Sequence, residues 1–245
     1  MMRRLLFTLI VLAGGGGVIP VALAAEFTPS QRGEIVAIVR DALKQDPSIL
    51  RDAITALQAD DDAQQSVAAH NAITQLHDAL ITPADPVAGN PHGDVTIVEF
   101  FDTRCPYCRR MEPAMQTFLE QDKKVRLVFK DLPILGPESL LGSKALLAAQ
   151  KQGAYVRMRD AVMKLPRDTT MQQLQDTAHQ LGLDWPRMAK DMEDPTIQTR
   201  LDANIELARK LGVQGTPALV IGSEMIPGAV DLPDLRKAVA AARHG

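Results

Sequence analysis

The chain contains only two cysteines, and both lie in one tetrapeptide, Cys105-Pro106-Tyr107-Cys108. A disulfide between two residues so close together closes almost no loop, so it would stabilise a fold far less than a bridge between distant segments. An exported protein that uses cysteines as structural staples usually spaces them widely. The spacing therefore indicates that this pair serves chemistry.

The tetrapeptide lies between an expected strand and an expected helix. Residues Val95–Phe101 read VTIVEFF, a nearly continuous β-prone run typical of a buried central strand, and residues 109–121 have a helical pattern. Cys105 then lies at the N-terminus of a helix, where backbone N–H groups and the helix dipole favour a thiolate and lower the pKa of the thiol. We expect Cys105 to be the nucleophile and Cys108 to attack the mixed disulfide that it forms. Pro106 suits the first helical turn.

The rest of residues 83–245 predicts an α/β fold. A second strand over 125–130 follows the helix, which makes a βαβ unit. Helical patterns then fill residues 137–212, with breaks at Pro166, Pro186 and Pro195 and expected caps at Thr169-Thr170 and Asp184. A late strand, Ala218–Ile221, a short partner over 225–230 and a closing helix over 231–243 complete the domain. We expect a sheet with a helical insertion.

Residues 25–82 predict an all-helical N-terminal segment. Thr28 and Gln31 form an expected capping box, and Asp46-Pro47 restarts the helix. Narrow apolar stripes follow, which must be buried either against copies of the same chain or against the rest of this chain. Residues 82–93 hold three prolines and two glycines, which indicates a linker or a loop with an edge strand between the two modules.

The first 24 residues predict a secretory signal peptide. Arg3 and Arg4 precede an apolar stretch, and the small-residue triplet that ends at Ala24 suits cleavage after that residue. We therefore expect a periplasmic protein. The chain has 27 basic residues, of which Arg3 and Arg4 would be removed, against 30 acidic ones, so no basic patch points to nucleic acid.

Two metal-binding alternatives apply to the cysteine pair. A zinc site is disfavoured, since the chain has no second CxxC and no histidine close in sequence to either cysteine. A copper-binding role stays open, because soft thiolates bind Cu(I) well. We expect no metal at the catalytic site and no organic cofactor.

The segments EFFDTRCPYCRR at 99–110, DLPILGPES at 131–139 and Gly215-Thr216-Pro217 before a late strand resemble the DsbA-like thioredoxin-fold proteins. With the helical preface they resemble the ScsC type, named for suppression of copper sensitivity. The resemblance implies a cis peptide bond before Pro217, facing Cys105, and a Thr216 backbone that pairs with an extended substrate.

The resemblance also implies that Glu99 is a buried acid. A carboxylate among Val and Phe side chains has a raised pKa and can exchange a proton with Cys108. We expect Lys130, at the end of the next strand, to lie near it. A solvent-facing strand position is the alternative for Glu99.

One departure from the resemblance affects the expected direction of the reaction. DsbA-like oxidases have histidine where this chain has Tyr107, and a histidine cation there makes the disulfide strongly oxidising. The tyrosine therefore favours a disulfide isomerase or reductase over an oxidase. The helical preface, which in such relatives can trimerise, favours the same activities and a homo-oligomer. We expect it to act on exported proteins with cysteines, with a membrane redox partner of unknown identity. The alternatives are a monomeric dithiol oxidase and a copper-binding protein.

Overall fold

The computed structural model describes residues 27–244, so the predicted signal peptide lies outside the described residues. Two compact units divide the chain, one ending at Gln58 and the other beginning at Ala59. Among the helices within 27–244, none combines the length and the apolar character needed to cross a membrane.

The N-terminal region is helical, as predicted. Helix α1 (Pro29–Gln45) begins with the expected capping box, in which Thr28 and Gln31 bind each other's backbone N–H groups. Helix α2 (Ser48–Gln75) follows, and the Asp46 carboxylate accepts the Ser48 N–H at 3.0 Å. A short helix, α3 (His77–Leu80), ends the helical N-terminal region.

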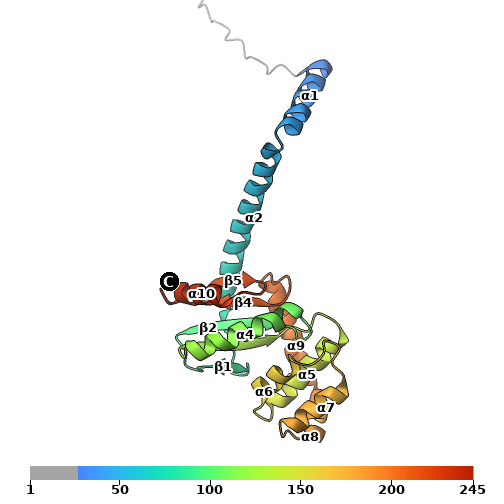
Figure 1. Ribbon diagram of the computed structural model, residues 1–245, viewed down its shortest axis with the longest axis vertical. Coiled ribbons are helices and arrows are strands. Elements are labelled where there is room, and N and C mark those ends of the chain that lie inside the picture. The colour runs from blue at the N-terminus through green and yellow to red at the C-terminus, as the bar shows by residue number, and fades with distance from the viewer. Residues whose placement is uncertain (1–26, 245) are drawn as a thin grey trace, which may run out of the picture. The chain divides into compact units, whose positions relative to one another are not determined.

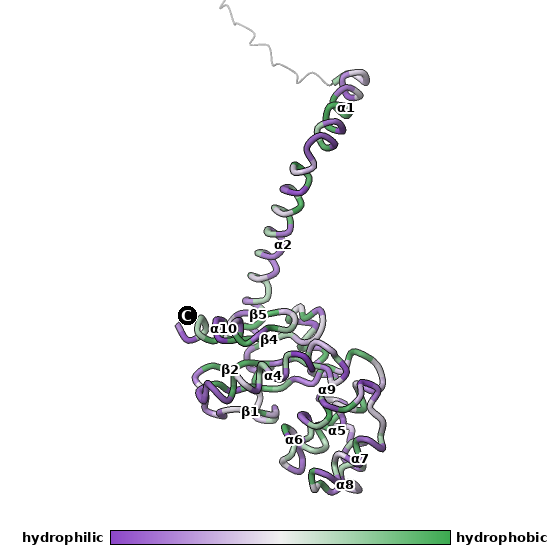
Figure 2. The backbone as a smooth tube through the Cα atoms, viewed as in Figure 1, coloured by the Kyte–Doolittle hydropathy of each residue, from purple (hydrophilic) through white to green (hydrophobic). Residues whose placement is uncertain are grey.

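The apolar residues of α1 and of the first part of α2 are exposed in the single chain. Ile38 is 67% exposed and Leu57 is 66% exposed. Figure 2 shows apolar and polar residues alternating along both helices. Ile73 and Leu80, by contrast, are buried among residues of one face of the sheet. The exposed residues that make up what we call the N-terminal apolar stripe are Ile35, Ile38, Val39, Leu43, Ile49, Leu50, Ile54 and Leu57.

A five-stranded sheet forms the centre of the larger unit, in the order β1-β3-β2-β4-β5 (Figure 1). Strand β2 (Val95–Phe101) pairs parallel with β3 (Val125–Asp131) and antiparallel with β4 (Ala218–Ile221). Strand β5 (Glu224–Pro227) lies at one edge. The proline-rich segment supplies the other edge, because β1 (Val87–Gly89) pairs antiparallel with β3.

Ten helices lie among residues 27–244, and seven of them belong to the α/β body. Thr170 and Asp184 cap two of the insertion helices as expected, and the residues Pro166, Pro186 and Pro195 lie between helices or in their first turns. The helical insertion predicted over 137–212 is therefore confirmed. The seven helices are α4 (Pro106–Gln121), α5 (Pro137–Gln150), α6 (Tyr155–Val162), α7 (Met171–Gln180), α8 (Trp185–Met192), α9 (Pro195–Lys210) and α10 (Leu232–His244).

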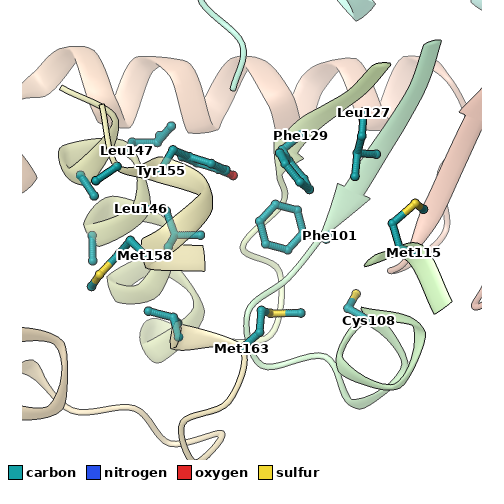
Figure 3. Packing of buried hydrophobic residues seen from close by; sticks show 14 of the residues in the cluster. Phe101, Cys108, Met115, Leu127, Phe129, Leu146, Leu147, Tyr155, Met158 and Met163 are labelled. Carbon is teal, nitrogen blue, oxygen red and sulfur yellow. The ribbon is translucent and has the colours of Figure 1, made fainter. Parts of the chain in front are cut away.

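The sheet separates two hydrophobic clusters, because successive side chains of a strand point to opposite faces. Ile97 of β2 belongs to the larger cluster, with α4, α10 and the insertion, whereas Val98 belongs to the smaller one, with Ile73 and Leu80. Cys108 belongs to the larger cluster, and Figure 3 shows it on the same side of Phe101 as Met115. The α4 residues at the site are thus anchored in a close-packed core.

Candidate active site

The two cysteines occupy the first turn of α4. Cys105 is the N-cap residue, Pro106 stands at the first helical position and Cys108 lies one turn inside, as predicted. Both thiols are free, and both side chains are buried, with Cys105 3% and Cys108 0% exposed. Strand β2 ends at Phe101, so only three residues join the central strand to the site. The rigid sheet therefore fixes where the sulfurs lie.

The environment of Cys105 lowers the pKa of its thiol from 9.0 to about 5. The largest cause is a hydrogen bond from the Cys108 side chain, followed by one with Thr216 and by the backbone N–H groups of Cys108 and Tyr107, while burial acts in the opposite direction. The helix N-terminus contributes as the sequence predicts, but the partner thiol contributes more. At neutral pH this sulfur is mainly a thiolate, the form that attacks disulfides.

The pKa of the second thiol, Cys108, is shifted in the other direction. Burial raises the pKa of Cys108 far above its ordinary value, and the hydrogen bond that it donates to Cys105 and the charge of Glu99 raise it further. Cys108 is therefore protonated at neutral pH. Before Cys108 can act as a nucleophile, a base has to remove its proton.

A loop from the far end of the chain faces the cysteines. Cys105 Sγ lies 3.1 Å from the Thr216 carbonyl oxygen, across 111 positions of sequence, and donates a hydrogen bond to it when the thiol is protonated. The Thr216–Pro217 peptide bond is cis, as the resemblance implies. Pro217 in turn accepts a hydrogen bond at its carbonyl oxygen from the Gly228 N–H at 2.9 Å, which ties the loop to the end of β5. Backbone atoms of this loop therefore border the reactive sulfur.

The residues next to the cysteines divide between solvent and interior. Tyr107 is 54% exposed, and the Arg110 guanidinium lies 4.6 Å from the centre of its ring. Arg109 points back into the fold, where its Nε donates to the Thr103 carbonyl oxygen at 2.8 Å. Arg104 forms ion pairs with Glu138 and Asp168. Arg104 and Arg109 thus hold loops together, whereas Arg110 lies beside the exposed Tyr107 ring.

Asp102 connects the active-site turn to a second loop. Its buried carboxylate accepts hydrogen bonds from the backbone N–H groups of Arg104, Ile134 and Leu135 and from the Ser139 hydroxyl, at 2.7 to 3.0 Å. A carboxylate that accepts four hydrogen bonds holds its donors firmly in place, because hydrogen bonds to a charged acceptor are stronger than those between neutral groups. It holds the turn before Cys105 in place. Sequence reasoning missed this residue.

Glu99 is completely buried on β2, which excludes the solvent-facing alternative. Burial raises the pKa of its carboxyl to about 7, against the lowering effect of Arg159. The Arg159 Nη2 lies 3.1 Å from Glu99 Oε2. The other oxygen, Oε1, has no hydrogen-bond partner among the described residues. The site thus contains a buried acid whose pKa is raised toward neutral pH.

The prediction that Lys130 lies near Glu99 is wrong. Its neighbour across the sheet is Phe100 rather than Glu99, and because Phe100 points to the opposite face, Lys130 pairs with Asp85 at 2.8 Å. The cation beside Glu99 is Arg159, from the helical insertion. One feature of the sequence could have indicated it: Arg159 falls on the apolar face of α6 formed by Tyr155, Met158 and Val162.

Residues that could hold a metal are few. Within residues 27–244, no group of three or more His, Cys, Asp and Glu side chains is arranged to bind an ion. The cysteine pair offers two sulfur ligands, which suit a soft ion such as Cu(I). Chemically, then, the arrangement supports thiol–disulfide exchange and, as a second possibility, copper binding.

Two family models match the chain. The model described as DSBA-like thioredoxin domain matches residues 96–240, and the one described as Copper resistance protein ScsC N-terminal domain matches residues 31–64. The two matches together cover nearly all of β2 to β5, the insertion and most of the N-terminal helices, whereas β1 lies between them.

Solved structures agree with both matches. A thioredoxin-like oxidoreductase from Silicibacter pomeroyi is 40% identical, with a TM-score of 0.66, over 69% of this chain and 98% of that one. ScsC from Proteus mirabilis, in a transitional conformation, is 33% identical, with a TM-score of 0.65, over 89% of this chain and 98% of that one. The predicted fold, a thioredoxin fold with a helical insertion and a helical preface, is confirmed.

The chain is also similar to one part of a much larger protein. The Na(+)/H(+) antiporter NhaA 3 of Salinispora tropica is 30% identical over 169 residues, which are 66% of this chain and 26% of the antiporter. This chain therefore spans about a quarter of the length of that relative.

Proposed function

This chain belongs to the DSBA-like thioredoxin domain family, and on that premise we propose that it is a protein thiol–disulfide oxidoreductase with Cys105 and Cys108 as its redox pair. The proposal rests above all on one observation. The buried Cys105 sulfur, with its lowered pKa, lies 3.1 Å from the Thr216 carbonyl oxygen, beside a backbone that an extended peptide can pair with. A nucleophilic sulfur and a peptide-binding edge are what exchange with a polypeptide needs.

The proposed reaction proceeds in two steps. The Cys105 thiolate attacks a client disulfide, which breaks the client S–S bond, forms a mixed disulfide and releases one client thiolate. Cys108 then gives its proton to Glu99 and attacks the Cys105 sulfur. A Cys105–Cys108 disulfide forms, the second client thiolate leaves, and two electrons have passed to the client. The reverse sequence oxidises a client dithiol.

Isomerisation uses only the first step. If the released client thiolate attacks a different client disulfide and the rearranged client later displaces Cys105, the enzyme ends as it began and no net electrons move. Tyr107 supports this direction, because it offers no cation to make the disulfide strongly oxidising. We propose exported proteins with cysteines as clients, a periplasmic location, and a membrane redox partner that restores the pair.

We further propose that residues 25–82 form an oligomerisation segment, with residues 83–245 as the catalytic domain. The exposed N-terminal apolar stripe supports this, since narrow stripes at helical spacing are typical of helices that associate with copies of themselves. The expected assembly is a homo-oligomer, of which a trimer is one form. Several catalytic domains around one misfolded client would raise the effective concentration of thiolates without any new contact.

The experiment compares two reactions, oxidation of a reduced client and unscrambling of a misoxidised one. In the double variant Ile38→Glu with Leu57→Glu, two charges enter the N-terminal apolar stripe at positions that are more than 60% exposed in one chain. We expect the assembly to dissociate, the oxidation rate per chain to stay the same, and unscrambling to fall about tenfold or more.

The matched control adds the same two charges to the same helices at polar positions, Gln45→Glu and Gln58→Glu. It should leave both assembly and unscrambling unchanged. A dissociated stripe variant that unscrambles at the wild-type rate would rule out isomerisation by self-association. A wild-type chain that sediments as a monomer and only oxidises clients would favour the monomeric oxidase.

A second candidate function is copper binding by the dithiol, favoured by the match of residues 31–64 to a domain of a copper resistance protein. Titration of the reduced protein with Cu(I), followed by the unscrambling assay, separates the two functions. If Cu(I) binds with a stoichiometry of one per pair and activity on disulfides is absent in the copper-free protein, copper binding is the main function.

A further inference from the structure

Arg159 is a charged side chain in the interior of the helical insertion. It is 1% exposed, and its guanidinium carbon lies 4.7 Å from the ring centre of Phe101 and 4.3 Å from that of Phe129. The faces of aromatic rings attract a cation but do not hydrate it. The charge of Arg159 therefore acts on its neighbours with little screening by water.

The guanidinium of Arg159 divides its donors between two carboxylates. Nη2 lies 3.1 Å from Glu99 Oε2, and Nη1 lies 2.6 Å from Glu112 Oε2. A planar fork of donors fixes carboxylate positions better than a single ammonium group does. One oxygen of Glu99 is thus held, and the other, Oε1, is left buried and free of hydrogen-bond partners among the described residues.

We propose that Arg159 is a positioning residue for the exchange reaction: it holds Glu99 through Oε2, keeps that carboxylate available as a base, and leaves Oε1 to accept the proton of Cys108. This inference rests on the proposed function, in which Glu99 serves Cys108. The helical insertion then supplies a part of the redox machinery as well as covering the sheet, and the conformation of α6 affects how fast a mixed disulfide is resolved.

The charges around Glu99 show why it needs a cation. Glu112 from α4 and Asp131 from β3 both raise the pKa of Glu99, after burial, which is the largest cause, and Arg159 is the cation that opposes them. Cys105 adds a further negative charge once it is a thiolate. Asp160 lies 3.8 Å from the same guanidinium. Without Arg159, the Glu99 carboxyl would stay protonated at neutral pH and could not accept a proton.

The test follows the resolution step by itself. The reduced protein is mixed with excess oxidised glutathione, and the phase whose rate does not depend on glutathione concentration reports the attack of Cys108 on the mixed disulfide. We expect the wild-type rate to rise with pH through an inflection near 7. In Arg159→Met the inflection should move up by about 1 to 3 pH units, the usual effect of losing an opposite charge. The rate at pH 7 then falls about fivefold for the first unit and about tenfold for each further unit.

Three comparisons separate positioning from simple structural support. Arg159→Lys, which keeps the charge, should return the inflection most of the way. Arg157→Met, the same change at an exposed position of α6, should leave the profile unchanged. In a Glu99→Gln background, Arg159→Met should cause no further shift, because the group that it tunes is gone. Partial unfolding lowers the amplitude of the glutathione-independent phase. It does not change the rate constant of that phase, so the dependence of the rate constant on pH stays the same.

An Arg159→Met profile identical to wild type, or a shift of the same size in the Glu99→Gln background, would overturn the inference. If the methionine variant does not fold, Arg159→Gln replaces it with the same expectation, because an uncharged amide can still donate to a carboxylate. A wild-type profile in Glu99→Gln alone would instead refute the role of Glu99 in the proposed function. Loss of all exchange in Cys105→Ser is the separate test of the redox pair.

Discussion

The thiol of Cys105 lies 3.1 Å from the carbonyl oxygen of Thr216, although 111 positions of sequence separate the two residues. The contact joins the helix that begins at the redox pair to the loop that contains the cis peptide bond. Two distant segments thereby make one reactive site.

Serine substitutions of the two cysteines should have different effects on disulfide exchange. Cys105→Ser removes the nucleophile, so exchange with a model disulfide should fall to the uncatalysed rate. Cys108→Ser leaves the nucleophile but removes the resolving thiol, so clients should accumulate as mixed disulfides. Non-reducing gel electrophoresis after acid quenching shows the trapped species. Measurable turnover by Cys105→Ser, or no trapped client with Cys108→Ser, would contradict the assigned roles.

The rate of alkylation should report the thiolate at Cys105. Because the pKa of Cys105 is lowered to about 5, its reaction with iodoacetamide should have a half-maximal rate near pH 5 and change little between pH 6 and 8. Cys108, whose pKa is raised and which is buried, should not react in the folded protein. Mass spectrometry of peptides after timed labelling measures both. A half-maximal rate near pH 9, as for an ordinary thiol, would exclude an activated sulfur.

The stability of the reduced protein should depend on pH in a way that the oxidised protein does not share. The Cys105 pKa is about 5 when folded and about 9 when unfolded, so the unfolded chain binds the extra proton between these values. The stabilisation is therefore complete above pH 9 and is lost as the pH falls to 5, with a slope of at most about 1.4 kcal/mol per pH unit.

Glu99 acts in the opposite sense. Its pKa rises from 4.5 to about 7 on folding, so it costs stability as the pH rises between those values. The difference in unfolding free energy between reduced and oxidised protein, from urea titrations, removes the part of this contribution that comes from burial, which is its largest cause. The same pH dependence in both forms would show that Cys105 is not ionised in the folded protein.

Asp102→Asn should destabilise the protein by about 1 to 3 kcal/mol, because the amide presents an NH₂ group to donors that now share a charged acceptor. The loop that contains Ile134 and the turn before Cys105 lose their common anchor. Urea unfolding measures the loss. Asp168→Asn is the matched control, since its side chain is 81% exposed and an exposed pair with Arg104 should contribute little. Equal effects of the two changes would contradict the account.

The sequence predicted the site on β2 and α4 because its causes are local. A continuous apolar strand, a CxxC and a helix with Pro106 at its first position follow one another within a few residues, and helix N-termini lower thiol pKa values wherever they occur. The capping residues Thr28 and Thr170 were predictable for the same reason. Each of these features needs only its neighbours in the chain.

The tertiary structure decided which distant groups meet. Lys130 was expected beside Glu99, yet the pleat of β3 turns it to the other face, and Arg159 from the insertion takes that place. The largest influence on the Cys105 pKa is the buried Cys108 thiol rather than the helix N-terminus. Burial and the register of paired strands determine such contacts, and neither is a property of a short segment. The sequence therefore determined where the two sulfurs lie, at the start of α4, whereas the packing of distant elements decided what charges surround them.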